Sequence, residues 1–267
     1  MKESCNNNNI ISWKAPSNIA LIKYWGKRSF QLPMNPSLSI TLDNSTTTTE
    51  MSFEKNNNKK RKITFFFEQN ENLPFASKIE NHFEKIEEEF PIIKEYDFII
   101  NSCNTFPHSS GIASSASSMA SLNLCVTSLL LRHDLIKKDY FFQVASRLSR
   151  MGSGSACRSL FANYTEWGVS SNEYATPVTE VHENFKNIHD AILIISGKEK
   201  AVSSRVGHSL MENHPFKEVR YKNAHTRLET LFHILSQGDW KNFIAIVEAE
   251  ALELHAMMMC STPPYIL

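Results

Sequence analysis

The sequence predicts an α+β fold in two lobes, in which an antiparallel or mixed sheet with helices is followed by a helix-rich part. Two observations predict it. Residues 19–67 carry the alternation and the β-branched side chains of strands, whereas residues 202–259 carry apolar side chains at helical spacing. The composition changes within residues 172–186, and strands with helices followed by helices alone indicate this fold class. We therefore expect a first lobe at residues 1–185 and a second, helix-rich lobe at residues 186–267.

Four strands are expected before residue 70. The second alternates strictly between apolar and polar side chains, and the third is rich in threonine, which favours strands. An antiparallel sheet is their natural arrangement. The connection Asn56–Lys62 is polar and basic, so we interpret it as a solvated hairpin tip. The expected strands are Ile19–Tyr24, Leu38–Leu42, Thr46–Phe53 and Ile63–Phe67.

Helices are expected wherever apolar residues recur every three or four positions. Residues Ala76–Phe90 place Ile79, Phe83 and Ile86 on one face, which is the pattern of an amphipathic helix. The remaining elements expected in order are a strand at Tyr96–Ile100, helices at Ser114–Leu131 and Tyr140–Met151, strands at Leu160–Trp167 and Ala191–Ser196, and helices at Val202–Asn213, Lys217–Ser236 and Trp240–Met259.

The last expected helix carries acidic residues and a histidine that invite interpretation as a metal site or a general base. Their spacings are mixed and ordinary for a helix surface, so we interpret them as a solvated face. They are Glu248, Glu250, Glu253 and His255.

Charge and composition exclude several classes of partner. Basic and acidic residues balance at 28 each, so the basic tip Lys59–Lys62 is weak support for nucleic-acid binding. The five cysteines are widely spaced, which favours a reducing compartment over a disulfide framework. The N-terminus lacks the pattern of a secretory signal, and no apolar stretch reaches the about 20 residues that span a bilayer. We expect a soluble, cytoplasmic protein that binds neither nucleic acid nor membranes.

The segment Gly152–Arg158, with the sequence GSGSACR, is the first candidate for a binding site. Glycine allows a ligand to approach the backbone closely, and serine donates hydrogen bonds. The guanidinium of Arg158 can hold a carboxylate or a phosphate through two parallel bonds. These groups suit a phosphorylated carboxylic acid. An ordinary Gly/Ser turn followed by a surface arginine explains the segment alone equally well.

The loop Pro107–Ala116 precedes the long expected helix. Serines there can cap the helix, and the first helical amides with the helix dipole form a binding place for phosphate. The loop lacks the Lys-Ser/Thr ending of a P-loop and the glycine pattern of dinucleotide-binding folds. Serines that only cap a helix are the alternative.

A third segment, Lys23-Tyr24-Trp25-Gly26-Lys27, follows the first expected strand. A lysine held there can neutralise phosphate charge or polarise a hydroxyl, and Tyr24 can donate a hydrogen bond to an anion. Taken alone, this segment is better explained as an exposed strand end with solvated lysines and core aromatic side chains.

Together the three segments resemble the diphosphomevalonate decarboxylases of the GHMP kinase superfamily. The loop Gly111-Ile112-Ala113-Ser114-Ser115 is general to the superfamily, although Ile112 replaces a usual leucine. The segments Lys23–Lys27 and Gly152–Leu160 are distinctive of the decarboxylases. The resemblance implies the two-lobed GHMP-kinase-type fold, a cytoplasmic homodimer, and phosphorylation of the tertiary hydroxyl of diphosphomevalonate by ATP with Mg²⁺. Loss of phosphate and carbon dioxide then gives isopentenyl diphosphate.

The resemblance also implies a role for each matching residue. Lys23, Ser153 and Arg158 would be catalytic. The substrate-binding residues would be Tyr24, Lys27, Ser153, Ser155, Arg158, Ser204 and Arg205. Those binding ATP would be Ser109, Ser110, Gly111, Ala113, Ser114 and Ser115, with Ser115 also at the metal ion.

One feature of the family is missing from this sequence. The decarboxylases carry an aspartate in an Asp-Ala-Gly segment of the C-terminal lobe, where it orients or deprotonates the tertiary hydroxyl, and this chain has no such segment. Because relatives continue beyond the position of Leu267, we expect a truncated part of a larger enzyme. A phosphomevalonate decarboxylase, a GHMP small-molecule kinase and a non-catalytic nucleotide-binding remnant remain alternatives.

Overall fold

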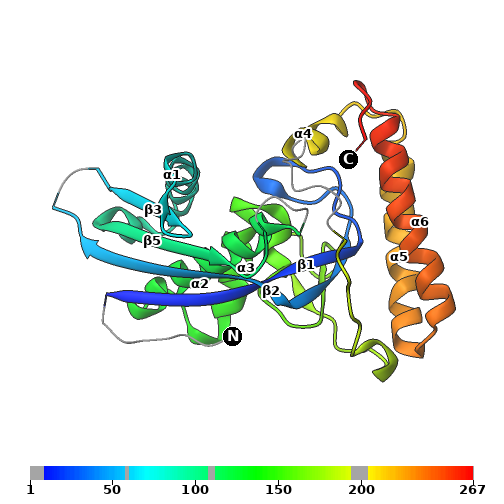
Figure 1. Cartoon of the computed structure of the whole chain (residues 1–267), viewed down its shortest axis with the longest axis horizontal. Coiled ribbons are helices and arrows are strands. Elements are labelled where there is room, and N and C mark those ends of the chain that lie inside the picture. Colours follow the sequence, from blue (N-terminus) through cyan, green and yellow to red (C-terminus); the bar gives the residue numbers. More distant parts are fainter. Residues whose placement is uncertain (1–8, 58–59, 108–111, 194–203, 267) are drawn as a thin grey trace. The chain divides into compact units, whose positions relative to one another are not determined.

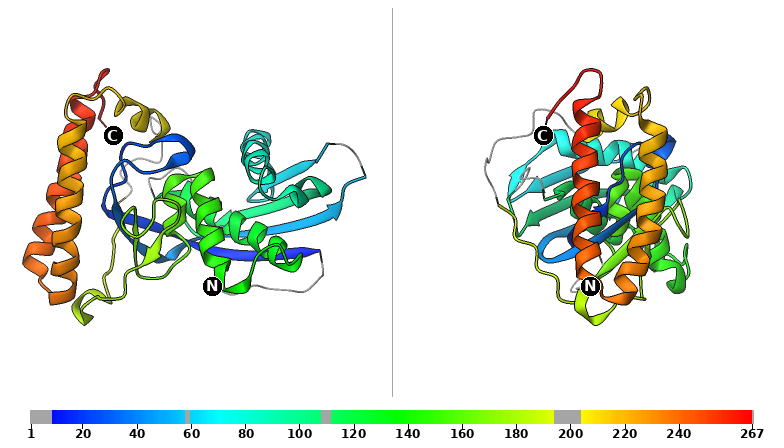
Figure 2. Two further views of the ribbon diagram at one scale, coloured as in Figure 1. Left: turned by 180° about the vertical axis from the view of Figure 1, so that it is seen from behind. Right: turned by 90° about the vertical axis from the view of Figure 1, so that its right-hand side faces the viewer.

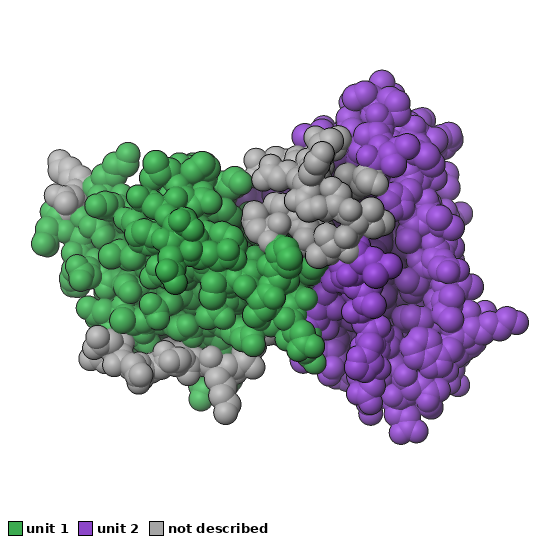
Figure 3. Space-filling model, in the orientation of Figure 1, with its two compact units in different colours: residues 1–17, 43–108, 112–160 green, residues 18–42, 109–111, 161–267 purple. Residues whose placement is uncertain are grey.

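The computed structural model describes residues 9–57, 60–107, 112–193 and 204–266, and its fold is α+β with a seven-stranded, mostly antiparallel sheet (Figure 1). By internal contacts the chain divides into two compact units, which Figure 3 colours separately. Unit 1 comprises Met1–Ser17, Asp43–His108 and Ile112–Leu160, and unit 2 comprises Asn18–Leu42, Ser109–Gly111 and Phe161–Leu267. The lobe boundary expected at residue 185 stays a prediction.

The long strands β1 (Ile10–Ile22) and β2 (Ser37–Lys55) each contribute residues to both units. The sequence predicted two strands where β2 is one. Asp43 and Asn44 interrupt the apolar alternation, but both are exposed. Polar side chains therefore fit an uninterrupted strand at this point.

The part of the sheet in unit 1 is mixed. Its strand order is β4–β3–β5–β2. β5 (Tyr96–Asn104) runs antiparallel to β2, with Met51 opposite Ile100, whereas β3 (Ile63–Phe67) runs parallel to β5. β4 (Asn70–Glu71) forms a short hairpin with β3. Because β5 lies between β2 and β3, the expectation that residues 56–62 form a hairpin tip is wrong.

Three helices complete unit 1, namely α1 (Leu73–Glu87), α2 (Ser114–Arg132) and α3 (Phe141–Gly152). The helix expected from residue 76 begins at Leu73, because the side chain of Asn72 accepts a hydrogen bond from the amide of Phe75. Ile79 and Ile86 are buried, as the periodicity predicts. As part of the connection between β3 and β5, α1 belongs to the crossover that parallel strands require.

A row of hydroxyl pairs joins α2 to the sheet in unit 1. Thr47 and Ser117 are 2.6 Å apart between their Oγ atoms, as are Thr49 and Ser121. These pairs satisfy hydroxyls that burial would otherwise penalise. By length and composition alone this helix could cross a membrane, but 78% of its apolar stretch is buried inside the protein. That burial favours a core helix.

Unit 2 combines residues 37–42 of β2 with β6 (Tyr164–Trp167) and β7 (Thr176–Pro177). Its helices are α4 (Ser204–Leu210), α5 (Lys217–Gln237) and α6 (Trp240–Met259). Figures 1 and 2 show α5 and α6 running side by side. Buried side chains from the sheet and these two helices form its main core, including Leu21, Leu38, Tyr164, Leu228, Leu231 and Phe243.

Two expected strands of unit 2 differ in the structure. β6 begins at Tyr164 rather than at residue 160. Residues 191–193 are irregular, and the rest of the expected strand, residues 194–196, lies outside the described residues. Short 3-10 helices lie at Ser29–Gln31 (η1), Pro91–Glu95 (η2), Lys138–Tyr140 (η3), Gly154–Arg158 (η4) and Glu183–Phe185 (η5).

The basic connection before β3 contains a buried arginine rather than a fully solvated set of charges. Arg61 is 8% exposed. Its guanidinium lies 2.7 Å from a carboxylate oxygen of Glu80 and 2.8 Å from one of Glu87, both on α1. Long-range pairing, which local composition does not reveal, makes this residue part of the fold.

We predict that Arg61→Ala lowers the free energy of unfolding by about 2–4 kcal/mol, because two partly buried carboxylates lose their partner. Lys94→Ala is the matched control, since Lys94 is exposed and lies 3.5 Å from Glu87. It is expected to cost at most about 0.5 kcal/mol. Urea titrations followed by circular dichroism measure both, and equal losses would contradict the assignment.

Candidate functional site

The residues expected to bind ligands fall into two clusters, one in each unit. Ala113, Ser114, Ser115, Ser153, Ser155 and Arg158 belong to unit 1, whereas Lys23, Tyr24, Lys27, Ser204 and Arg205 belong to unit 2. Ser109, Ser110 and Gly111 lie outside the described residues, as do the side chains of Ser204 and Arg205.

In unit 1 the segment from Ser153 to Arg158 forms a tight turn between α3 and β6. Ser153 ends α3 in extended conformation and begins η4, and its carbonyl accepts a hydrogen bond of 2.8 Å from the amide of Ala156. The η4 helix contacts both α2 and α3. Ser153 and Ser155 are partly exposed, whereas Arg158 is buried at 2% exposure. The guanidinium is thus held by the core rather than lying on the surface.

Close packing of neighbouring side chains leaves no room for a side chain at position 152. A Cβ atom there would lie 2.7 Å from Sδ of Met119 on α2 and 3.3 Å from Cε1 of His82 on α1. The sequence offered close approach of a ligand as the reason for this glycine. In the structure the close approach is that of two neighbouring helices.

The imidazole of His82 supports this junction from inside unit 1. Its Nε2 lies 2.9 Å from Oδ1 of Asn123 on α2. Burial lowers the pKa of His82 to about 4, against a smaller opposing effect of the hydrogen bond to Asn123. The ring is therefore neutral near pH 7, and its Nε2 carries the proton that Asn123 accepts.

The start of α2 has an uncommon conformation. Its N-cap residue, Ala113, is left-handed with φ of 51° and ψ of 42°, and none of the described side chains caps the helix. The described serines therefore do not cap α2, whereas Ser109 and Ser110 lie outside the described residues. Helix N-termini with uncapped amides and a favourable dipole suit phosphate. Ser114 is half-buried and Ser115 is exposed at this end.

In unit 2 the core fixes the backbone of Lys23, where β1 has just ended. The amide of Lys23 donates a hydrogen bond of 2.9 Å to Oε1 of Glu250. Its carbonyl accepts bonds of 2.9 Å from Nδ2 of Asn35 and 3.0 Å from the guanidinium of Arg220. Its Nζ donates to the carbonyl of Ala20 at 2.8 Å. The backbone of a candidate catalytic lysine is thus anchored on both sides.

Glu250 is at the centre of a buried ion cluster between α5 and α6. Its side chain and that of Arg220 are fully buried, and the pair is bidentate, with 3.0 Å for the longer contact. Arg227 adds a contact of 2.8 Å to Glu250 and one of 2.6 Å to Glu253. Interpretation of Glu250 as part of a solvated helix face is therefore wrong. Burial lowers the pKa of Arg227, but the hydrogen bonds and charges of Glu250 and Glu253 outweigh it and raise this pKa overall, so the guanidinium of Arg227 stays charged.

The side chains of Tyr24 and Lys27 lie close to a left-handed turn. The hydroxyl of Tyr24 donates to the carbonyl of Gln31 at 3.0 Å, and Nζ of Lys27 lies 3.2 Å from Oε1 of the same residue. Phe30 and Gln31 both have positive φ, of 55° and 62°. Such conformations are uncommon for non-glycine residues. The segment and the turn that follows it therefore form one local structure.

The ring of His208 on α4 lies against the same segment. Its Nδ1 accepts a hydrogen bond of 3.1 Å from the amide of Gly26. The ring centroid is 4.5 Å from that of Tyr24 and 4.7 Å from that of Trp25. The contacts bring α4, which begins at Ser204, against the Lys23–Lys27 segment. Burial, and then the charge of Lys27, lowers the pKa of His208 to about 3.

Sequence reasoning missed Arg220, Glu250 and His208. For Arg220 and Glu250 the sequence did contain one signal, the spacing of charged residues along two helices. Arg220 and Arg227 are seven residues apart and Glu250 and Glu253 three apart, so each pair lies on one face of its helix. Complementary charges on two adjacent helices indicate pairing. His208 carries no such signal.

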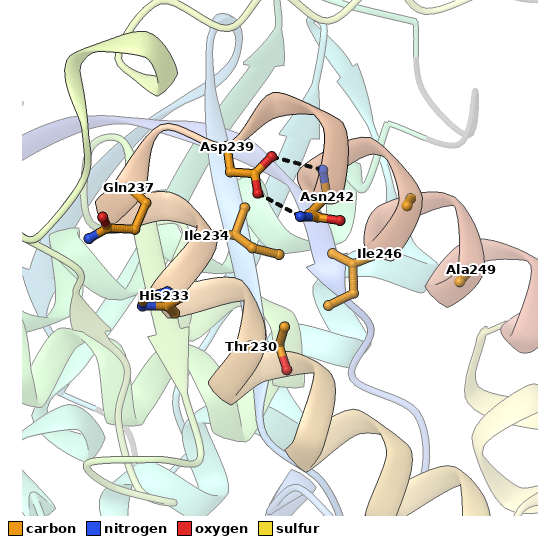
Figure 4. A pocket seen from close by; sticks show the side chains of 9 residues that line it. Thr230, His233, Ile234, Gln237, Asp239, Asn242, Ile246 and Ala249 are labelled. Carbon is orange, nitrogen blue, oxygen red and sulfur yellow. Dashed lines mark hydrogen bonds between the residues drawn. The ribbon is translucent and has the colours of Figure 1, made fainter.

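A separate groove lies between α5 and α6 of unit 2, with a volume of about 670 Å³ (Figure 4). Asp239 caps α6 at its edge, with its carboxylate accepting from the amide of Asn242 at 3.2 Å. Ile234 and Ile246 line its apolar part. The residues expected to bind ligands do not line this groove.

Comparison with known proteins identifies the family. Residues 15–178 match the family described as the diphosphomevalonate decarboxylase-like N-terminal domain, which is more than half of the chain. The chain belongs to the diphosphomevalonate decarboxylase family. The matched stretch includes the candidate segments Lys23–Lys27 and Ser153–Arg158. The resemblance on which the sequence-based roles depend is therefore confirmed at the level of the family.

Curated relatives match nearly the whole chain, and they are longer than it. The diphosphomevalonate decarboxylase of Ganoderma lucidum is 32% identical over 94% of this chain and 66% of its own length. That of Schizosaccharomyces pombe is 31% identical over 94% of this chain and 67% of its own length. The chain thus spans about two thirds of the length of these curated relatives.

Solved structures confirm the expected fold. Mevalonate diphosphate decarboxylase from Staphylococcus aureus has a TM-score of 0.80 at 29% identity, covering 97% of this chain and 76% of that chain. The structure of MDDEF in complex with MVAPP, AMPPCP and magnesium has a TM-score of 0.77 at 29% identity, covering 96% of this chain and 78% of that chain.

We predict that Glu250→Gln lowers the free energy of unfolding by about 3–5 kcal/mol, because it leaves the buried charge of Arg220 with only its longer contact, 3.4 Å, to the carboxylate of Glu253. The matched control is Glu248→Gln on the exposed face of α6, with no measurable loss. Replacing both members, as Arg220→Met with Glu250→Leu, should recover part of the loss. Guanidinium titration measures all three, and an unchanged midpoint for Glu250→Gln would contradict the buried pairing.

We predict that Gly152→Ala destabilises the protein by about 1–2 kcal/mol through overpacking against Met119. Adding Met119→Ala to the glycine variant should make the combined loss smaller than the sum of the two single losses. Thermal unfolding of the four proteins measures this coupling. Strictly additive losses would show that the space beside Gly152 is not shared with Met119.

Proposed function

We propose that this protein catalyses the ATP-dependent decarboxylation of diphosphomevalonate to isopentenyl diphosphate. One observation carries the proposal. A relative that matches 96% of this chain at 29% identity has been solved with MVAPP, AMPPCP and magnesium together. A cytoplasmic location and a homodimeric state belong to the same proposal.

The start of α2 is the proposed contact for the phosphates of ATP. Its first amides have no cap from the side chains that the structure describes, and the left-handed Ala113 turns the chain into the helix. Amides there suit phosphate oxygens, and the exposed hydroxyl of Ser115 suits Mg²⁺. Among the described residues no cluster of three acidic, histidine or cysteine side chains could hold the ion. We infer that the phosphates supply most of its ligands, as is common for Mg²⁺. Ser109, Ser110 and Gly111 complete this proposed site.

The proposal assigns substrate contacts to the residues of each unit separately. Ser153 and Ser155 bind the diphosphate and align the tertiary hydroxyl, and Arg158 holds the carboxylate through its two parallel N–H groups. Tyr24 and Lys27 contact phosphate oxygens, and Lys23 lies near the reacting hydroxyl. Ser204 and Arg205 contact the phosphoryl groups.

These residues fit what the reaction requires. Hydroxide leaves a tertiary carbon poorly, whereas phosphate leaves readily. ATP and Mg²⁺ supply the phosphoryl group and part of the charge stabilisation. As phosphate departs with its bonding electrons, the carbon becomes positive and draws in the pair of the breaking bond to the carboxylate, so carbon dioxide is lost. Fixed cationic side chains stabilise the departing phosphate, and their positioning lowers the barrier without rearrangement during the reaction.

The product of the gene, expressed between its own start and stop codons, provides the test. Incubation with ATP, Mg²⁺ and diphosphomevalonate should release ADP, phosphate and carbon dioxide in equal amounts. Faster turnover of phosphomevalonate than of diphosphomevalonate would identify the monophosphate as the substrate. ADP formation without carbon dioxide would indicate a kinase, and ligand binding without any turnover would indicate a non-catalytic remnant. Each of these three results overturns the proposal.

We predict that Arg158→Ala raises the dissociation constant for diphosphomevalonate about tenfold to hundredfold, because a charged hydrogen-bonded contact contributes about 1.5–3 kcal/mol. Arg158→Lys should recover only part of the affinity, since lysine lacks the planar fork. Arg147→Ala is the matched control, because Arg147 on α3 pairs with Glu89 at 2.6 Å. Calorimetric titration measures each affinity, and equal affinities for the two alanine variants would contradict the assignment.

A further inference from the structure

His208 has a more specific role than filling space in unit 2. It is buried at 9% exposure, and its ring contacts two consecutive aromatic residues of the Lys23–Lys27 segment. Nδ1 faces the amide of Gly26. A phenylalanine could supply the ring contacts but not the acceptor. The structure therefore uses both properties of the imidazole.

Gly26, whose amide donates the hydrogen bond to His208, cannot easily be replaced by a residue with a side chain. Gly26 has φ of +93°, a conformation that side chains disfavour, and a Cβ atom there would lie 2.4 Å from the hydroxyl oxygen of Tyr221. The amide of Gly26 donates to His208 from a turn, between Trp25 and Lys27, whose conformation glycine adopts readily and other residues do not. An acceptor at this point holds the turn that separates the two candidate lysines.

The helix that carries His208 lies unusually close to the same segment. A Cβ atom on Gly207 would lie 2.6 Å from Cη2 of Trp25. Only a residue without a side chain permits this approach. His208 and Gly207 thus fix α4, and with it the backbone that begins at Ser204, against the Lys23–Lys27 segment.

We propose that His208 is a positioning residue, which holds the Lys23–Lys27 segment and α4 in the arrangement that binds the phosphate groups of the substrate. Its neutral imidazole accepts from Gly26 and packs between α4 and the aromatic residues. The role assigned to the phosphate contacts rests on the proposed function, whereas the role in holding Gly26 does not.

Two variants of His208 separate its acceptor from its ring. His208→Asn keeps an acceptor near the position of Nδ1, and His208→Phe keeps an aromatic ring without an acceptor. The matched control is His214, which is also buried and whose Nδ1 also accepts from a backbone amide, that of Phe216 at 3.1 Å. Phe216 is not among the residues proposed to bind ligands. Circular dichroism establishes that each variant is folded.

The first readout is hydrogen exchange at the amide of Gly26, measured by NMR in the full chain. We expect at least a tenfold increase in its rate in His208→Phe, a smaller increase in His208→Asn and none in His214→Asn. An unchanged rate in His208→Phe would overturn the proposal. This readout requires no activity.

The second readout is steady-state kinetics with diphosphomevalonate. We expect His208→Phe to raise KM about tenfold with kcat changed less than about threefold, and His208→Asn to recover most of the loss. A KM change in His208→Phe no larger than that in His214→Phe would overturn the positioning role. Absence of turnover in the unsubstituted protein would instead overturn the proposed function, and the exchange of Gly26 would then decide the role of His208 alone.

Discussion

The buried carboxylate of Glu250 is the constraint on which unit 2 depends. A charge without contact with water is costly unless it is fully paired. Glu250 meets this requirement through Arg220, Arg227 and the amide of Lys23, so the end of β1 and the faces of α5 and α6 have to come together. The contacts that pair the charge of Glu250 also fix the backbone position of Lys23, a candidate catalytic residue.

This arrangement explains how residues in a connecting segment can be held precisely. Catalysis by positioning requires groups that do not rearrange during the reaction. Lys23 is anchored through its backbone by Glu250 and Arg220, and Gly26 through its amide by His208. In unit 1, Arg158 is buried within a turn that packs on α2 and α3. In unit 2 the anchoring residues Glu250, Arg220 and His208 lie outside the three sequence motifs that resemble the family.

The sequence predicted what local pattern can encode. Strand β3 and helix α6 begin and end where their periodicity indicates, and the buried face of α1 is as expected. Pairing between distant residues was not predictable in the same way. The environments of Arg61 and Glu250 depend on partners in other elements, so local composition suggested solvation. The motifs located the candidate ligand contacts, but the reason for Gly152, its packing against Met119, required the structure.

The most direct test of this account is native-state hydrogen exchange at the amide of Lys23. If the carboxylate of Glu250 holds this amide as part of the unit 2 core, its opening free energy should equal that of the α5 core amides, such as Leu228 and Leu231, within about 1 kcal/mol. Exchange through a local opening several kcal/mol less costly than that of the core would contradict the account, because the lysine segment would then move independently of the ion cluster.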